Sequence, residues 1–156
     1  MSQEVDAPEE QPRGELTVRT SAMPGDTNAN GDIFGGWVMA QVDLAGSVLP
    51  SRLGQSRMVT VAVNEFIFKQ PVRVGDILSF YSSVQRVGRT SVTVDVEVYA
   101  ERFADQGRFV KVTEALLTYV AIDGQGKPQS LPDNDQVRSW RAAAERNAER
   151  KQQQAG

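Results

Sequence analysis

Asp43 is the side chain of this sequence best suited to proton transfer or nucleophilic attack. It is the only charged residue between Gly35 and Leu49, in a segment, GGWVMAQVDLAGSVL, that is otherwise almost wholly apolar. A carboxylate in apolar surroundings is costly unless it is paired, hydrated or used in catalysis. Asp43 is therefore either a structural aspartate, bonded to a neighbour such as Ser47, or a general base that lines a pocket with one wet end.

The chain contains neither histidine nor cysteine, and this narrows its chemistry. Without them there is no cysteine nucleophile, no Ser-His-Asp triad and no imidazole acid or base. Zinc sites of the usual kind and the common haem ligands are excluded as well. Any proton transfer has to use Asp, Glu, Lys or Tyr, with electrostatic help from backbone amides, Asn, Arg or hydroxyl groups.

Gly35 and Gly36 begin the apolar segment that contains Asp43. The first amides of a helix have no acceptor within the helix, and glycine leaves them uncovered. With the helix dipole they form a site for negative charge, such as an oxyanion that develops on a carbonyl. The alternative is that the two glycines only allow the helix to pack closely on a sheet.

The segment DTNANGDI, over residues 26–33, resembles the first eight positions of an EF-hand calcium loop. Position 12 of such a loop is a bidentate glutamate, and Trp37 occupies it here. We therefore expect no metal site, but a tight turn in which Asn, Asp and Gly bond to one another.

The segment RVGRTS, over residues 86–91, combines two guanidinium groups with two hydroxyls around Gly88. Such a turn suits a phosphate or an amide-containing ligand. Solvated turn residues are the alternative interpretation.

The spacing of apolar residues and the position of turn residues predict an α+β domain. Its strands and helices would position the candidate residues described above. In the clearest strand, residues 90–99, four valines face one side, while Asp95 and Glu97 face the other. The apolar segment should be a helix, buried all round and stopped by Pro50, and an exposed helix should follow near the end. The predicted strands cover residues 15–20, 58–68, 77–85, 90–99 and 109–122; the predicted helices cover 35–49 and 134–151. The first helix is too apolar to be covered by one sheet, which favours dimerisation through sheet edges.

Composition is typical of a single domain that binds neither nucleic acid nor membrane. The 156 residues carry a net charge of -3, and their Lys and Arg are scattered. No run approaches the roughly 18 to 20 apolar residues of a membrane helix. The first 15 residues, acidic and polar, predict a disordered arm and no secretory signal, hence a cytoplasmic protein.

Taken together, these motifs resemble the YciA-like acyl-CoA thioesterases of the hot-dog superfamily. The resemblance spans roughly residues 16–132 and includes a specific signature, the loop before the helix together with Asp43. The matching segments are MP at 23–24, DTNANGDIFGGW at 26–37, VTV at 59–61, PV at 71–72, VGD at 74–76, GRTS at 88–91, TEA at 113–115 and YVAID at 119–123. The chain departs from the family at Asn64, where members often carry an acidic residue.

The resemblance implies a hot-dog fold: an antiparallel sheet of about five strands wrapped round one long buried helix, followed by a C-terminal helix. Residues 16–132 would form the thioesterase domain, after the arm at 1–15 and before a charged helix and tail at 133–156. It also implies hot-dog dimers assembled into a trimer of dimers, and hydrolysis of acyl-CoA to a carboxylic acid and CoA without metal or cofactor.

The family's site residues fall on particular positions of this chain. The resemblance makes Asp43 the general base or nucleophile and Asn28 the residue that orients water or the carbonyl, the two meeting across a dimer interface. The Gly36 amide would polarise the thioester carbonyl. Thr60 would border the site, and the remaining expected contacts to CoA are Gly88, Arg89, Thr90 and Ser91. The competing interpretation is an acyl-CoA binding or sensing module that does not catalyse.

Overall fold

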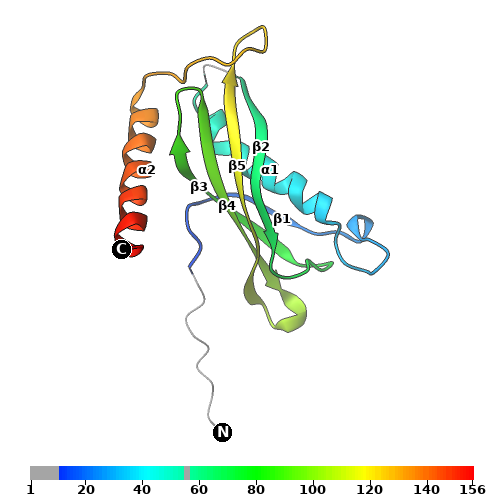
Figure 1. Cartoon of the computed structure of the whole chain (residues 1–156). Helices are drawn as coiled ribbons and strands as arrows, with labels where there is room; N and C mark the ends of the chain where they lie inside the picture. The colour runs from blue at the N-terminus through cyan, green and yellow to red at the C-terminus, as the bar shows by residue number, and fades with distance from the viewer. Residues whose placement is uncertain (1–10, 55–56) are drawn as a thin grey trace.

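The computed structural model describes residues 11–54 and 57–156, which form one antiparallel sheet and two helices (Figure 1). The predicted α+β class is confirmed. The five strands lie in the order β1-β3-β4-β5-β2, so β1 and β2 are the edges. The strands are β1 (Glu15–Ser21), β2 (Arg57–Phe68), β3 (Ile77–Val87), β4 (Ser91–Arg102) and β5 (Arg108–Ile122), and the helices are α1 (Gly35–Ser51) and α2 (Asp135–Gln154).

The core lies between α1 and one face of the sheet, here called the inner face. Val92, Val94, Val96 and Val98 of β4 are completely buried there, as their alternation predicts. They pack with the side of α1 that carries Val38, Val42 and Ala45. Burial of each such side chain contributes about 1.5–3 kcal/mol to folding, so this contact holds α1 in place on the sheet.

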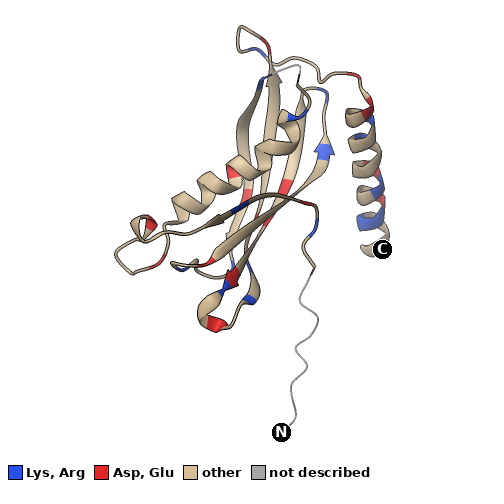
Figure 2. Ribbon diagram, turned by 180° about the vertical axis from the view of Figure 1, so that it is seen from behind, with Lys and Arg blue, Asp and Glu red and all other residues tan. Residues whose placement is uncertain are grey.

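The prediction of a helix buried all round is wrong for a single chain. Only one side of α1 is covered, while Met39 and Leu44 remain 42% and 55% exposed. Figure 2 shows α1 crossing the sheet, and Asp43 is the one acidic residue of this helix. The outer side of the helix is thus apolar and uncovered.

The prediction that Pro50 stops α1 is also wrong, because the proline lies inside the last turn. Proline removes only its own N–H, and the turn is closed beyond it: the Arg52 N–H donates to Leu49 O and the Leu53 N–H to Pro50 O, both at 3.1 Å. These bonds to the third residue back are a common way for a helix to tighten at its end.

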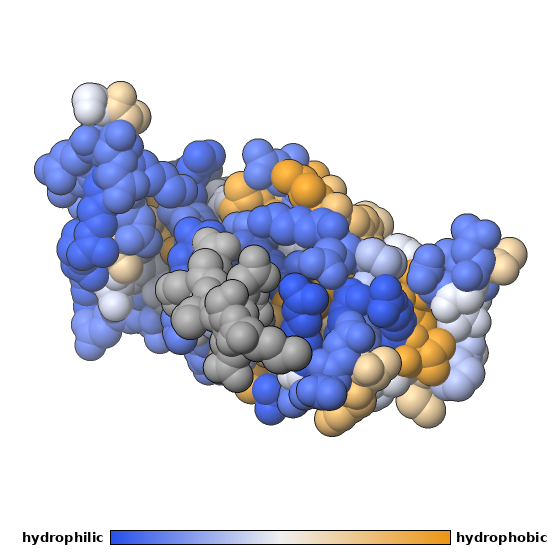
Figure 3. Space-filling model, turned by 90° about the horizontal axis from the view of Figure 1, so that it is seen from below, coloured by the Kyte–Doolittle hydropathy of each residue, from blue (hydrophilic) through white to orange (hydrophobic). Residues whose placement is uncertain are grey.

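The edge strand β2 exposes large apolar side chains. Val61, Val63, Ile67 and Phe68 are each 44% to 55% exposed. An unpaired strand edge with exposed apolar side chains favours association with another chain. Figure 3 shows further apolar groups at the surface among polar ones, in the view from below.

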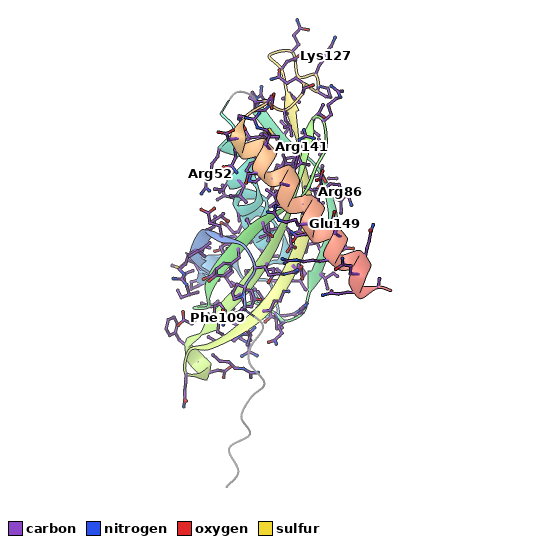
Figure 4. The ribbon with its side chains drawn as sticks, turned by 90° about the vertical axis from the view of Figure 1, so that its left-hand side faces the viewer. Arg52, Arg86, Phe109, Lys127, Arg141 and Glu149 are labelled. Carbon is purple, nitrogen blue, oxygen red and sulfur yellow. The ribbon has the colours of Figure 1, made fainter. Side chains whose placement is uncertain are left out.

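The second helix packs along β3 (Figure 4). The Asn134 side chain accepts a bond of 2.9 Å from the Val137 N–H and caps its start. Val137 and Trp140 pack on the core, so α2 is not fully exposed. Between α2 and the outer face of the sheet lies a cavity of about 410 Å³, lined in part by Arg86 and Arg141.

The predicted arm lies mostly outside the described residues, which begin at residue 11. Its last part contacts the sheet, because the Arg13 guanidinium donates to Glu97 and to Glu114 at 2.6 and 3.0 Å. None of the described helices is long and apolar enough to cross a membrane.

Candidate active site

The Asp43 carboxylate is half-buried on α1 and is held by hydroxyl groups from the sheet. Thr60 of β2 donates to Oδ1 at 2.7 Å, and the Tyr119 hydroxyl of β5 lies 3.1 Å from the same oxygen. Thr60 and Tyr119 are opposite each other in the β2–β5 ladder, so two adjacent strands present their hydroxyls side by side. Asp43 is therefore paired, as the cost of a carboxylate in apolar surroundings requires.

Tyr119 reaches the helix because Gly46 leaves room for it. A β-carbon at position 46 would lie 2.5 Å from the Tyr119 hydroxyl, well inside van der Waals contact. The hydroxyl lies 2.9 Å from the backbone oxygen of Asp43 as well as near its carboxylate. Burial, and then the negative charge of Asp43, raise the pKa of Tyr119 far above its usual range. It remains a neutral donor at all physiological pH values.

Ser47, suggested as a structural partner of Asp43, is not one. Its hydroxyl donates to Leu44 O at 2.7 Å, a back-bond common for serine inside helices. The partners of Asp43 come from distant strands instead, and a pattern of neighbours along one helix does not reveal them.

The loop before α1 is the self-bonded turn that we predicted from its Asn and Gly residues. The Asn28 Oδ1 accepts bonds of 2.9 and 3.2 Å from the Asn30 and Asp32 N–H groups, and Gly31 has a φ of 82°. These bonds occupy the oxygen that an EF-hand loop would offer to a cation. In the described part of the chain the Asn28 amide nitrogen has no partner, so its N–H groups are the ones available to a ligand.

Gly36 presents an open helix start. The described residues provide no acceptor for its N–H, and a β-carbon there would meet nothing within 4 Å. Gly35 differs, since a β-carbon would lie 3.4 Å from the Phe68 ring. Gly35 thus packs against the ring of Phe68, as the packing alternative predicts. Gly36 leaves its amide accessible, as the anion-site alternative predicts.

An apolar cavity of about 380 Å³ lies beside this helix start. Its walls come from the end of the loop, the first turn of α1 and the segment that follows β2. The apolar side chains in these walls are Ile33, Val38, Phe68, Pro71 and Val72.

Within one protomer, Asp43 is remote from Gly36 and Asn28. Asp43 lies seven positions after Gly36 in the helix, which is about 10 Å along the axis, and Asn28 lies before the helix start. One chain thus carries the Asp43 carboxylate at one point, and the Gly36 and Asn28 amides at another.

The predicted CoA turn lies at the sheet end nearest to Asp43. Ser91 precedes Val92, which is opposite Tyr119 in the β4–β5 ladder. The turn is closed by a bond of 2.8 Å from the Gly88 N–H to Ser91 O. Arg89 donates to the Ser130 hydroxyl at 3.0 Å, and Thr90 O accepts from the Ala121 N–H. These contacts fix the turn while Arg89 stays exposed.

Asn64, where the chain departs from the resembled family, lies away from Asp43. Its amide donates to the Thr118 hydroxyl at 3.0 Å. Thr118 and Tyr119 are consecutive in β5 and face opposite sides of the sheet, so Asn64 is on the outer face and Asp43 on the inner one.

Sequence patterns did not predict that acidic side chains gather in a cluster on the outer face. Asp95, Glu97 and Glu114 gather there with Arg13 and Lys111, and the first two are 3% and 1% exposed. Burial, and then the charge of Glu114, raise the pKa of Asp95 to about 7. Alternation identified the face on which Asp95 and Glu97 lie, but not their burial or their partners from other elements.

Comparison with known proteins identifies relatives of this chain. A profile of the thioesterase superfamily matches residues 30–102. The Escherichia coli acyl-CoA thioester hydrolase YciA is 48% identical over 123 residues, 78% of this chain and 93% of that protein.

Two solved structures are similar in fold. A hexameric broad-specificity acyl-coenzyme A thioesterase superposes with a TM-score of 0.79 and 40% identity, covering 86% of this chain and 99% of the other. A Staphylococcus aureus acyl-CoA hydrolase, solved with butyryl coenzyme A and coenzyme A, has a TM-score of 0.67 and 25% identity, with coverage of 88% and 86%. The predicted hot-dog architecture is thereby confirmed.

Proposed function

The chain belongs to the thioesterase superfamily, among the acyl-CoA thioester hydrolases related to YciA, and from this we propose that it hydrolyses acyl-CoA to a carboxylic acid and CoA. One observation carries the proposal: the charged residue of an apolar helix is a carboxylate held by two hydroxyls of the sheet. The chain has no histidine or cysteine that could replace it.

In the proposed reaction Asp43 acts as a general base. It takes a proton from a water molecule as the water oxygen bonds to the thioester carbon. The tetrahedral intermediate then expels the CoA sulfur, which receives the proton from Asp43, and the carboxylic acid is left. The chemistry needs neither metal nor cofactor.

The polarising groups come from a second copy of the chain. We place the Gly36 amide and the Asn28 amide group of the partner subunit at the carbonyl oxygen, where negative charge develops. The distance along α1 and the uncovered apolar side of that helix support a shared site. The similar thioesterase of known structure is hexameric, and we propose a trimer of hot-dog dimers here too.

The remaining site residues fit the two ends of the substrate. The apolar cavity beside Gly35 suits an acyl chain, since it is walled by aliphatic and aromatic side chains. The exposed Arg89, with Gly88, Thr90 and Ser91, suits the phosphates and pantetheine of CoA. CoA thioesters are made and used inside cells, so we expect a cytoplasmic enzyme.

The test is thiol release from a panel of acyl-CoAs, followed with a thiol reagent. Asp43→Ala should lower kcat by at least about a hundredfold, as for loss of a general base. Asp105→Ala is the matched control and should keep full activity, because this exposed aspartate lies in a single 3-10 turn, Phe103–Asp105, between β4 and β5. Full turnover in a folded Asp43→Ala protein would contradict the proposal.

Two further measurements separate the alternatives. If wild-type protein binds acyl-CoA in calorimetry but releases no thiol, it is a binding module and not an enzyme. Single-turnover hydrolysis in ¹⁸O-labelled water tests the role of Asp43: label in the Asp43 peptide requires an anhydride that water opens at the Asp43 carbon, whereas a general base places the label only in the carboxylic acid.

A further inference from the structure

We propose that Tyr119 is a positioning residue for the reaction: with Thr60 it holds Oδ1 of Asp43, so that Oδ2 is the oxygen that takes the proton from water. This inference rests on the proposed function and assigns a task to each oxygen of the carboxylate. Tyr119 itself touches neither water nor substrate.

The contacts of Asp43 are one-sided. Oδ1 lies 2.7 Å from the Thr60 hydroxyl and 3.1 Å from the Tyr119 hydroxyl. Oδ2 has no hydrogen-bond partner among the residues that the structure describes. A carboxylate rotates easily about its last bond, and two donors on one oxygen fix that rotation and leave the other oxygen free.

Tyr119 is a rigid anchor for this purpose. Its side chain is 1% exposed, and its strand is paired on both sides, with Thr60 across β2 and Val92 across β4. Its hydroxyl is within reach of both the backbone oxygen and the carboxylate of Asp43. One proton shared between these acceptors ties the helix and its catalytic side chain to the same point of the sheet.

Gly46 shows that this approach is built into the fold. Glycine inside a helix costs roughly 0.5–1 kcal/mol relative to alanine, and nothing in the backbone requires it, since its φ is not positive. What requires it is space, because any β-carbon would strike the Tyr119 hydroxyl. The cost is offset by a contact that places Asp43.

The experiment compares Tyr119→Phe with Tyr99→Phe. Both tyrosines are buried in the sheet, and the Tyr99 hydroxyl donates to Glu97 at 2.9 Å on the outer face. Each change removes one buried hydroxyl that bonds to a carboxylate, so their structural effects are matched. Only Tyr119 contacts the proposed base.

We expect Tyr119→Phe to lower kcat about 10- to 100-fold, the fold-change for loss of a hydrogen bond to a charged group, with KM within about twofold. Thr60→Val, which keeps the shape but not the hydroxyl, should behave in the same way. Tyr99→Phe should leave kcat unchanged.

Two outcomes overturn the inference. If Tyr119→Phe keeps wild-type kcat while Asp43→Ala is inactive, the proposed function stands and Tyr119 has no part in it. If Tyr99→Phe lowers kcat as much as Tyr119→Phe, the loss reflects general loosening of the sheet. Activity in Asp43→Ala instead removes the proposed function itself, so the two failures are distinct.

Discussion

Replacement of Gly46 by alanine tests the link between the fold and the site. Helix propensity alone predicts that alanine stabilises α1 by about 0.5–1 kcal/mol. The structure predicts the opposite, because the new β-carbon would lie 2.5 Å from the Tyr119 hydroxyl, 3.3 Å from Val96 Cγ2 and 3.4 Å from Tyr119 Cζ.

The size of the effect follows from these distances. Ordinary contact begins at about 3.4 Å, so the hydroxyl has to retreat by roughly 1 Å, while the Tyr119 ring and Val96 are held in the buried core. Overpacking of a core costs about 1–3 kcal/mol, and the shared hydrogen bond of the hydroxyl to Asp43, worth about 1 kcal/mol, is weakened. Steric repulsion and the weakened hydrogen bond outweigh the gain in helix propensity. We expect Gly46→Ala to lower the free energy of unfolding by about 1–3 kcal/mol.

The assay measures thermal unfolding and thiol release on the same preparations. A loss of that size lowers Tm by roughly 3–10 °C for a chain of this length, at equal protein concentration since assembly adds stability. kcat should fall about tenfold or more, since the Asp43 carboxylate loses its anchor. Gly124→Ala is the control, because a β-carbon there meets nothing within 4 Å.

A Gly46→Ala protein with a higher Tm and unchanged kcat would refute the reasoning. It would mean that helix propensity dominates and that the approach of Tyr119 to α1 has no functional weight. A lower Tm with unchanged kcat would keep the packing argument but separate it from catalysis.

Two further predictions concern the outer face and the sheet edge. The pKa of Asp95 is raised to about 7 from its usual 3.8. Between about pH 4 and 7 the folded chain therefore keeps a proton that the unfolded chain has released. The contribution of Asp95 to folding stability falls as pH rises through that window. Asp95→Asn should therefore raise the unfolding free energy by up to about 4 kcal/mol at pH 8, the free energy of the full shift, and change it little near pH 4 in urea titrations. An equal effect at both pH values would contradict this. On β2, Val61→Lys places a charge among exposed apolar side chains and should convert oligomer to smaller species in light scattering, with loss of activity, whereas Arg57→Lys at the start of the same strand should change neither.

The elements were predictable because each repeats a local pattern. Alternating valines identified β4, and its partner strands agree with prediction to within about three residues at their ends. The end of α1 was missed because Pro50 falls in a last turn that does not use its N–H. Such details depend on how a turn closes, and residue type alone does not decide it.

The candidate carboxylate could be identified from the sequence, but the side chains that hold it could not. Asp43 stood out as a charge in an apolar helix, whereas Tyr119 looks like any inward aromatic residue of a strand. Its importance depends on the register that sets Thr60 opposite it, and that register shifts between Thr60 and Ala62. Alternation along one strand carries no information about an irregular pairing with another.

The exposed apolar surface explains why the site should be completed by a second chain. Met39 and Leu44 on the outer side of α1, and Val61 and Ile67 on β2, would each cost free energy in water. All four lie on the two elements that carry Asp43 and Thr60. A partner that covers them also removes water from around the carboxylate, and fewer water molecules strengthen every charge interaction there. Assembly and catalysis thus depend on one surface, and a protomer kept monomeric should lose turnover even though every residue of its own site is intact.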